Sequence, residues 1–207
     1  IGTIFMVGIM KIDYRHFNSR PFILLMLVSA IGALIGCFIP GVGLTGGHAK
    51  RWVHLSSLNF QASEAAKVAL IFYLASYLTK KGTRIEDFSY GILPALVIVG
   101  ICALLIFVEP DFGTAATICV WALAVMFIAG MRWKHLLFMV LAGLPISACM
   151  MILEPYRRAR LLAFINPWED MHGIGYQIIQ SLVALANGGI IGSGLGESTQ
   201  KLFFLPA

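Results

Sequence analysis

A polar, glycine-rich segment near the end of the chain carries the residue types that do chemistry on an anionic substrate. Arg157, Arg158 and Arg160 are followed within about a dozen residues by the acidic pair Glu169 and Asp170. A guanidinium group matches phosphate oxygens through two parallel hydrogen bonds. A carboxylate takes a proton from a sugar hydroxyl as a general base. The segment therefore predicts a site that binds an anionic, membrane-borne substrate and activates a hydroxyl.

The same residues have structural interpretations, which the sequence alone leaves open. Asp170 is either a general base or a cap for the helix expected near residue 174. The arginines either bind pyrophosphate or anchor the end of a span to lipid head groups. Trp52 and Trp168 are interpreted first as interfacial anchors. Glu64 and Lys67, three residues apart on one helical face, are either a functional pair at membrane depth or a structural ion pair.

The composition indicates which elements must position these residues. Hydrophobic residues make up 59% of the 207 residues and charged residues 12%, with a mean hydropathy of +0.86, whereas soluble domains carry about 25% charged residues. Apolar runs near the ~20 residues that cross a bilayer are 21–39, 90–108, 113–130 and 135–152, with a shorter span at 65–78 and the end of another at 1–10. Asp111, just before one run, is interpreted as a helix cap. The chain is predicted to be an all-α polytopic membrane protein, a helical bundle in a single integral membrane domain over 1–207.

The distribution of charge predicts the orientation of the chain. The net charge is +5, and the basic residues fall in alternate short loops, namely Lys11, Arg15 and Arg20, then Lys80, Lys81 and Arg84, then Arg132 and Lys134. Basic short loops are typical of the cytoplasmic side, so 40–64, 109–112 and a large loop at 153–207 are expected outside. An amphipathic stretch at 174–187 is too short to span and is interpreted as a re-entrant helix. Cations spread over such loops, with no aromatic platform among them, exclude a nucleic-acid partner.

Several separate motifs, taken together and in order, resemble the SEDS family of bacterial cell-wall polymerases. They are Lys50–Trp52, Phe60–Lys67, Glu109–Thr114, Asn166–Asp170, Gly175–Ser181, Gly192–Gly196, Gln200-Lys201 and Leu205-Pro206. The Pro-Trp-Glu-Asp and Gln-Lys forms are more similar to the FtsW and SpoVE branches than to RodA. Two positions depart from the family pattern: Ala62 and Met171 stand where proline is usual, which changes loop stiffness but removes no chemical group.

The resemblance implies a SEDS-type helical bundle and an inverting peptidoglycan glycosyltransferase that polymerises lipid II at the outer face of the bacterial cytoplasmic membrane, at the division septum. It implies that Asp170 is the catalytic base. The residues expected to bind substrate or pyrophosphate are Arg51, Trp52, Glu64, Lys67, Arg157, Arg158, Arg160, Trp168 and Gln177. Mg²⁺ or Mn²⁺ would share the charge of the leaving group, but no ligand cluster identifies a metal site, and no other cofactor is expected.

The implied partners are lipid II, the undecaprenyl-pyrophosphate-linked glycan, a class B penicillin-binding protein that crosslinks the product, and other division proteins. Two other classes of function stay open. One is a lipid II flippase, which needs a path to the cytoplasmic face, and the other is a division scaffold without enzymatic activity. Family members have about ten membrane helices, so we expect this chain to be an internal portion of a longer protein.

Overall fold

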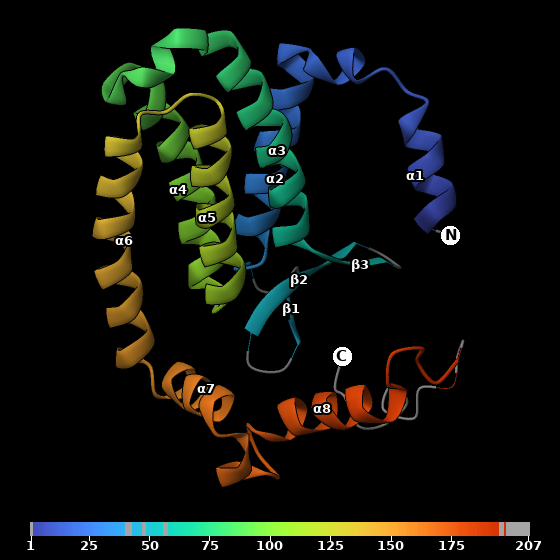
Figure 1. The fold of residues 1–207 in the computed structure, drawn as a ribbon. Helices are drawn as coiled ribbons and strands as arrows, with labels where there is room; N and C mark the ends of the chain where they lie inside the picture. Colours follow the sequence, from blue (N-terminus) through green and yellow to red (C-terminus); the bar gives the residue numbers. More distant parts are fainter. Residues whose placement is uncertain (1, 40–42, 47–48, 56–57, 195–196, 198–207) are drawn as a thin grey trace. The chain divides into compact units, whose positions relative to one another are not determined.

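The structure, a computed structural model, describes residues 2–39, 43–46, 49–55, 58–194 and 197 (Figure 1). It consists mainly of helices and divides into two compact units, Ile1–Phe138 and Met139–Ala207. The α-helices are α1 (Gly2–Met10), α2 (Arg20–Gly36), α3 (Ala62–Lys81), α4 (Leu93–Val108), α5 (Phe112–Ile128), α6 (Trp133–Leu153), α7 (Pro155–Ile165) and α8 (Tyr176–Gly188). Short helical turns are η1 (Tyr14–Asn18), η2 (Gly82–Glu86), η3 (Phe88–Ile92) and η4 (Pro167–Asp170).

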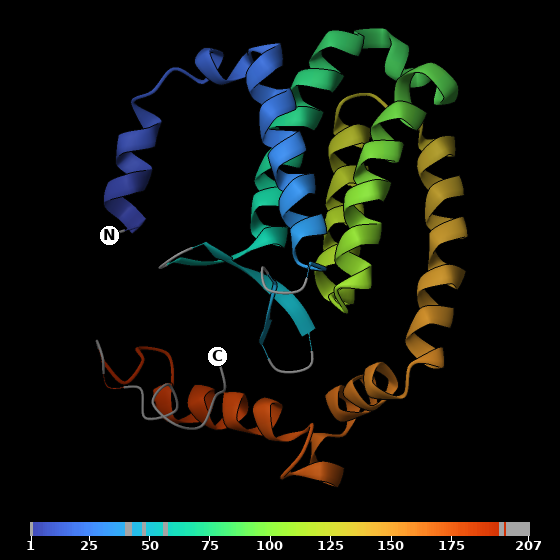
Figure 2. The same ribbon diagram turned by 180° about the vertical axis from the view of Figure 1, so that it is seen from behind.

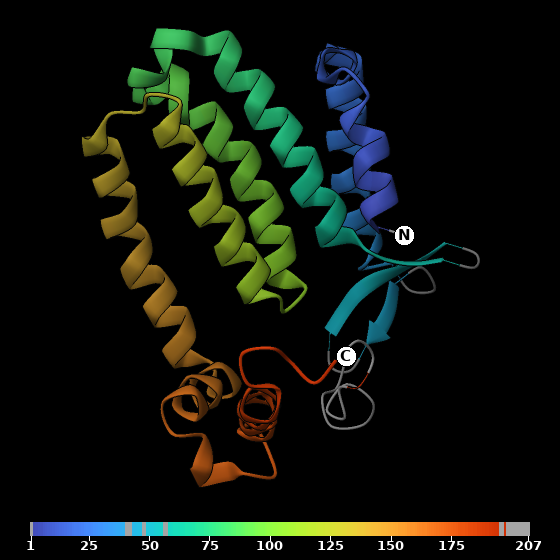
Figure 3. The ribbon, with the colours of Figure 1, turned by 45° about the vertical axis from the view of Figure 1, so that its right-hand side comes forward.

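The core of the first unit lies between α2, α3, α4 and α5, which run side by side (Figures 1 and 3). Each helix buries one residue in every three or four, as one face of a helix requires. On α3 the buried apolar positions are Ala62, Ala66, Ala69, Leu70, Leu74 and Leu78, and the other helices follow a similar spacing. Many of them are alanines, whose small side chains let helices approach closely where lipid supplies no hydrophobic drive.

The helices coincide with the apolar runs of the sequence, with ends shifted by a few residues. Within the described residues, two stretches of helix are long and apolar enough to cross a bilayer, Phe88–Val108 and Trp133–Leu153, and Arg20–Gly36 and Phe112–Ile128 are shorter apolar helices. Pro94 lies where η3 passes into α4, and Pro145 lies inside α6.

Between α2 and α3 the chain forms a small antiparallel sheet, which the sequence analysis treats as a loop. Its strands are β1 (Gly43–Gly46), β2 (Ala49–Leu55) and β3 (Leu58–Gln61), in that spatial order. Figure 2 shows the sheet at the end of the bundle opposite to η2 and η3. The β-forming run Trp52-Val53-His54-Leu55 supplies the central strand. Of the glycines in this segment, Gly43 and Gly46 stand at the two ends of β1.

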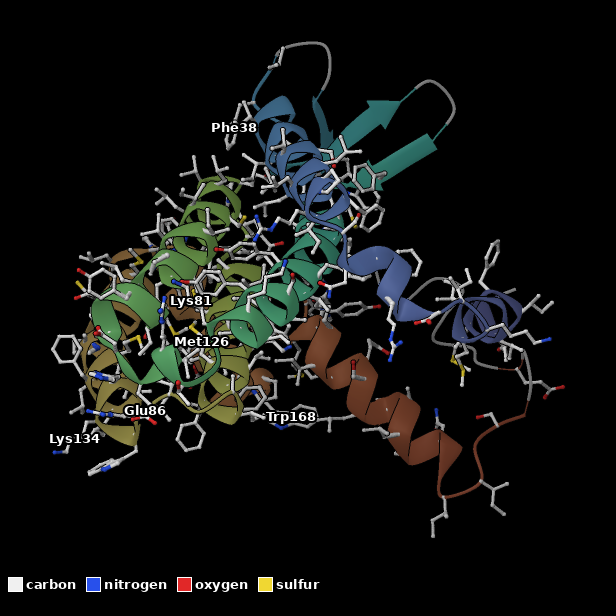
Figure 4. All side chains as sticks on the ribbon, turned by 90° about the horizontal axis from the view of Figure 1, so that it is seen from above. Phe38, Lys81, Glu86, Met126, Lys134 and Trp168 are labelled. Carbon is white, nitrogen blue, oxygen red and sulfur yellow. The ribbon has the colours of Figure 1, made fainter. Side chains whose placement is uncertain are left out.

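The opposite end of the bundle is closed by ion pairing between two connections. Arg132, just before α6, donates to Oε2 of Glu86 from Nε at 3.1 Å and from Nη2 at 2.9 Å. His135 Nε2 lies 3.2 Å from the carbonyl oxygen of Glu86. Figure 4, which views the molecule from above, labels Glu86 of the first connection and Lys134, two residues after Arg132. The α3–α4 and α5–α6 connections are therefore joined at this end.

Asp111 caps α5, as its position before an apolar run predicts. Its Oδ1 accepts the backbone N–H of Thr114 at 3.2 Å, and its Oδ2 accepts the Thr114 hydroxyl at 2.8 Å. One carboxylate thus satisfies a donor that the first turn of the helix leaves without an intrahelical partner. The cap interpretation of Asp111 is confirmed.

Candidate functional site

The three arginines of the polar segment lie on α7, a helix that the sequence analysis did not predict. Glu154 precedes the helix and Pro155 occupies its first turn, which favours a helix start. Arg157 donates from Nη1 to the carbonyl oxygen of Met150 at 3.3 Å, so its positive charge lies at the C-terminal end of α6. The guanidinium of Arg160 lies 5.6 Å from the centre of the Tyr156 ring, within cation–π range.

The arginines do not share one side of the helix. At about 100° per residue, Arg157 and Arg160 are roughly 60° apart, whereas Arg158 is roughly 160° from Arg160. Arg158 is exposed. Binding of an anionic group by these residues therefore stays a prediction. Arg157 and Arg160 are placed to contact one group together, whereas Arg158 would contact it from another side of the helix.

The acidic pair follows α7 on η4, and its two carboxylates are held by different local bonds. Glu169 Oε1 accepts the side-chain N–H of Asn166 at 3.1 Å. Asp170 uses both oxygens toward the backbone: Oδ1 accepts the N–H of Gly173 at 2.9 Å and Oδ2 accepts the N–H of Ile174 at 3.0 Å. Asp170 is exposed and, within the residues that the structure describes, forms no ion pair.

These bonds show that the two interpretations of Asp170 do not compete. An ionised carboxylate offers about four lone-pair positions, and the N–H groups of Gly173 and Ile174 use two. The remaining lone pairs are available to a substrate hydroxyl while the carboxylate keeps its orientation. Asp170 is therefore a cap for the turn before α8 in this structure, and its role as a base stays a prediction with a defined geometry.

Two glycines lie in close contact with this turn, one against a side chain and one against the backbone. A Cβ built on Gly173 would overlap the Asp170 carboxylate. A Cβ built on Gly175, which is buried, would overlap the carbonyl oxygen of Pro167 and lie 2.7 Å from that of Asp170. The backbone N–H groups of Gly173 and Gly175 also donate to the Asp170 carbonyl oxygen, at 3.3 and 3.2 Å. The sequence signal for this close packing was the Gly-x-Gly spacing that begins three residues after Asp170.

Trp168 and Gln177 flank Asp170 along the chain. Trp168 lies on η4 with 58% of its surface exposed, as an interfacial anchor or a substrate contact requires. Gln177 lies in the first turn of α8, and its side chain is exposed. The helix α8 occupies Tyr176–Gly188, where the sequence predicts a re-entrant helix at 174–187. Its position in a membrane stays a prediction.

The candidates of the first unit lie at the sheet and at the start of α3. Lys67 Nζ lies 2.7 Å from Glu64 Oε1, so the two form an ion pair that is largely exposed. Trp52 lies on β2 and is 40% exposed. Between β1 and β2 the register passes from Trp52 to Lys50, so Arg51 is the extra residue of a β-bulge. Bulges of this kind often occur beside functional sites.

The structure adds Glu109, which the sequence placed only in the expected outer loop 109–112 and in the Glu109–Thr114 motif. Glu109 ends α4 and is 1% exposed. It interacts with the thiol of Cys37 at the end of α2. A buried ionisable group in a membrane bundle marks a functional candidate. The signal for it was an acid placed directly at the end of the most apolar run.

The described residues contain no group of three or more His, Cys, Asp or Glu side chains arranged to hold a metal ion. Among the described residues the carboxylates nearest the arginines in sequence are Glu154, Glu169 and Asp170, and the last two already accept hydrogen bonds within η4 and its flanking turns.

The chain is similar to known proteins over its whole length. The model of the family of FtsW, RodA and SpoVE, described as "Cell cycle protein", matches residues 1–207. A probable peptidoglycan glycosyltransferase FtsW of Geobacter metallireducens is 42% identical over 206 residues, which cover 100% of this chain and 54% of that protein. Stage V sporulation protein E of Bacillus subtilis is 39% identical and covers 100% and 56%. The chain thus spans about half the length of the curated relatives it matches.

Solved structures support the same fold. A chain from a study of how a peptidoglycan synthase complex coordinates polymerization and crosslinking aligns with a TM-score of 0.67 and 28% identity, over 91% of this chain and 55% of that chain. The crystal structure of the rod shape determining protein RodA of Thermus thermophilus aligns with a TM-score of 0.52 and 22% identity, over 68% and 43%. The predicted class, a helical polytopic membrane bundle, is confirmed, with the small β1–β3 sheet as an addition to it.

Proposed function

We propose a function for this chain from one premise: it belongs to the family of FtsW, RodA and SpoVE, the SEDS family that its motifs resemble. The complete protein is a peptidoglycan glycosyltransferase that polymerises lipid II into glycan strands at the outer face of the cytoplasmic membrane during cell division. The names of its FtsW and SpoVE relatives support this assignment. The sporulation relative shows that the family serves more than one process.

One observation carries the proposal at the level of chemistry. The Asp170 carboxylate is exposed, is oriented by the N–H groups of Gly173 and Ile174, and retains lone pairs for a further donor. A base that is fixed before substrate arrives avoids the loss of conformational freedom during the reaction. No other acid of this segment combines exposure with two backbone hydrogen bonds among the described residues.

In the reaction Asp170 removes the proton from the 4-hydroxyl of the acceptor N-acetylglucosamine. The resulting oxygen nucleophile attacks the anomeric carbon of the donor N-acetylmuramic acid, the bond from that carbon to the pyrophosphate oxygen breaks, and undecaprenyl pyrophosphate leaves. A single displacement inverts the anomeric centre and needs one base rather than the two carboxylates of a retaining hydrolase.

The leaving pyrophosphate gains negative charge, which nearby cations stabilise. Arg157 with Arg160 on one side of α7, Arg158 on the other, and Arg51 at the β-bulge are the groups proposed for this task. Glu64, Lys67, Trp52, Trp168 and Gln177 are proposed to line the path of the lipid carrier and sugar. A divalent cation, Mg²⁺ or Mn²⁺, held by the phosphate oxygens would share the charge, and no step here depends on it.

The proposed partner is a class B penicillin-binding protein, which crosslinks the new strand. One structural neighbour belongs to a peptidoglycan synthase complex in which polymerization and crosslinking are coordinated, and this neighbour supports the proposal. The proposed location is the division septum, with the other division proteins, and the proposed orientation places the polar segment outside the cell.

The test compares the wild-type protein with Asp170→Ala. Each complete protein is purified with its transpeptidase partner and supplied with lipid II, with moenomycin present to silence polymerases of the other family. We expect long glycan strands from the wild type and none from a variant that melts at the same temperature. Equal polymer from both would exclude Asp170 as the base and direct attention to Glu169.

The same assay separates the two alternatives. A flippase makes no polymer but moves labelled lipid II across vesicles, and Asp170→Ala should leave that movement intact. A scaffold makes no polymer, moves no lipid, and tolerates Asp170→Ala in growing cells.

A further inference from the structure

We propose that Gly173 is a positioning residue for glycosyl transfer, because its missing side chain leaves the space in which the Asp170 carboxylate is held. The inference rests on the function proposed above and adds to it a residue that touches no substrate. It concerns how the base is kept in place rather than which residue is the base.

The geometry of the turn leaves no room for a side chain at this position. The three atoms nearest to a Cβ built on Gly173 all belong to the Asp170 side chain. That Cβ would lie 2.6 Å from Oδ1, 2.7 Å from Cγ and closer still to Oδ2. These separations are far below the ~3.5 Å at which carbon atoms begin to attract. Alanine at Gly173 therefore forces the carboxylate away from the N–H groups of Gly173 and Ile174.

The same substitution leaves the backbone of the turn intact. Gly173 does not belong to the glycines with positive φ, so alanine fits its backbone conformation. The turn is also held by backbone donation from Gly173 and Gly175 to the Asp170 carbonyl oxygen. Gly175 behaves differently, because its added Cβ would meet the backbone carbonyl groups of Pro167 and Asp170. Gly173→Ala should therefore move one side chain, whereas Gly175→Ala should break the turn.

Displacing the carboxylate should lower the rate of the chemical step rather than substrate affinity. A misplacement of about 1 Å can cost roughly a hundredfold in rate, so we expect kcat for Gly173→Ala to fall about 10- to 100-fold. The KM for lipid II should stay within about twofold, because an interaction made only in the transition state is lost. The melting temperature should match that of the wild type.

A matched control is available further along the same segment. Gly188 ends α8, and nothing lies within 4 Å of a Cβ built on it. Gly188→Ala makes the same chemical change without a clash, and its kcat should equal that of the wild type. Gly175→Ala should lose activity, raise KM and melt earlier. If Gly173→Ala matched Gly188→Ala in rate, or matched Gly175→Ala in all three quantities, the positioning role would be wrong.

A second measurement is independent of activity and uses hydrogen exchange of the peptide that contains residues 173 and 174. Asp170→Ala removes the side-chain acceptor of both N–H groups and leaves the Asp170 carbonyl oxygen to Gly173, so this peptide should exchange faster than in the wild type, chiefly at Ile174. Gly173→Ala should speed exchange to the same extent, and the double variant should add nothing further. Unchanged exchange in Gly173→Ala would overturn the inference even if its rate fell. A wild type without polymerase activity, with the expected exchange, would refute the proposed function but not the contact.

Discussion

The bundle of α2–α5 and the segment from α7 to α8 are stabilised in different ways. In the bundle, Leu34, Leu70, Leu74 and Ile106 are fully buried, and most polar contacts lie at the helix ends. In the described part of the α7–α8 segment, Ala163 and Pro167 are the buried apolar side chains, and α8 buries none. Its shape depends instead on short-range hydrogen bonds around Asp170.

This difference indicates which substitutions should change the stability of the protein and which should change the rate of its reaction. Packing in the bundle spreads its free energy over many contacts, none of which involves a candidate catalytic group. The α7–α8 segment has one carboxylate that both organises its turn and is proposed to react. Substitutions in the bundle should therefore change stability with little effect on the chemistry of folded protein, and those around Asp170 should do the reverse.

The largest expected effect is on the rate of polymerisation by Asp170→Asn. Asparagine keeps one oxygen to accept a backbone N–H but is not a base, and loss of a general base typically costs about 10²–10⁴ in rate. The melting temperature should hardly change. The measurements are kcat and the melting temperature of each variant. If Asp170→Asn lowered the melting temperature as much as a core substitution does, the proposed difference between the two regions would be wrong.

A core truncation in the bundle should show the opposite pattern. Leu70→Ala leaves a cavity at a fully buried position and should lower the free energy of unfolding by about 2–4 kcal/mol. Leu185→Ala, on α8 at a position that is 71% exposed, provides the control and should change it by about 0.5 kcal/mol or less. Unfolding in mixed detergent measures both. Similar losses in the two variants would mean that α8 is packed as tightly as the bundle.

Asp111 provides a comparison for Asp170, because its carboxylate caps a helix but has no proposed role in the reaction. Asp111→Ala removes the acceptor of the Thr114 N–H and should cost about 0.5–2 kcal/mol of stability. Asp111→Asn retains an acceptor and should recover most of it. Polymerisation by the folded Asp111→Ala protein should remain near the wild-type rate, and a hundredfold loss there would give this cap a functional role.

The smallest effect is expected for the ion pair of α3. Glu64→Gln removes the charge that pairs with Lys67 on an exposed surface, which is worth about 0.2–0.5 kcal/mol. Stability should therefore stay almost unchanged. The KM for lipid II decides between the two interpretations of the pair: a rise of about tenfold would assign it to the substrate path, and an unchanged value would leave it structural.

The sequence predicted those parts of the structure that depend on local pattern. The apolar runs marked the helices of the bundle, and Asp111 was recognised as a cap from its position alone. The turn chemistry of Asp170 could be stated only as an alternative, because which N–H groups a carboxylate reaches depends on the fold of Gly173–Gly175. The helix α7 was missed because its arginines were considered as a cluster, although Pro155 at its start and Asn166-Pro167 at its end are boundary signals.

The sheet and the burial of Glu109 could not be predicted from local sequence patterns, because both depend on contacts between segments that are separate in the sequence. Which residues of two strands face each other depends on the register of their pairing, and the sequence of one strand does not define that register. The β-bulge at Arg51 exists only in the pairing of β1 with β2. Glu109 and Cys37 are both buried where α2 and α4 pack against each other, and no spacing in the sequence reports that packing.

The ion pair between Glu86 and Arg132 joins two connections that α4 and α5 separate in the sequence. Arg132 reaches Glu86 only where α4 and α5 run in opposite directions and return the chain to the end from which it started. The pair therefore acts as a clasp on a two-helix hairpin. Because both side chains are largely exposed, the clasp contributes about 1 kcal/mol or less, so the packing of α4 against α5 decides whether the hairpin forms.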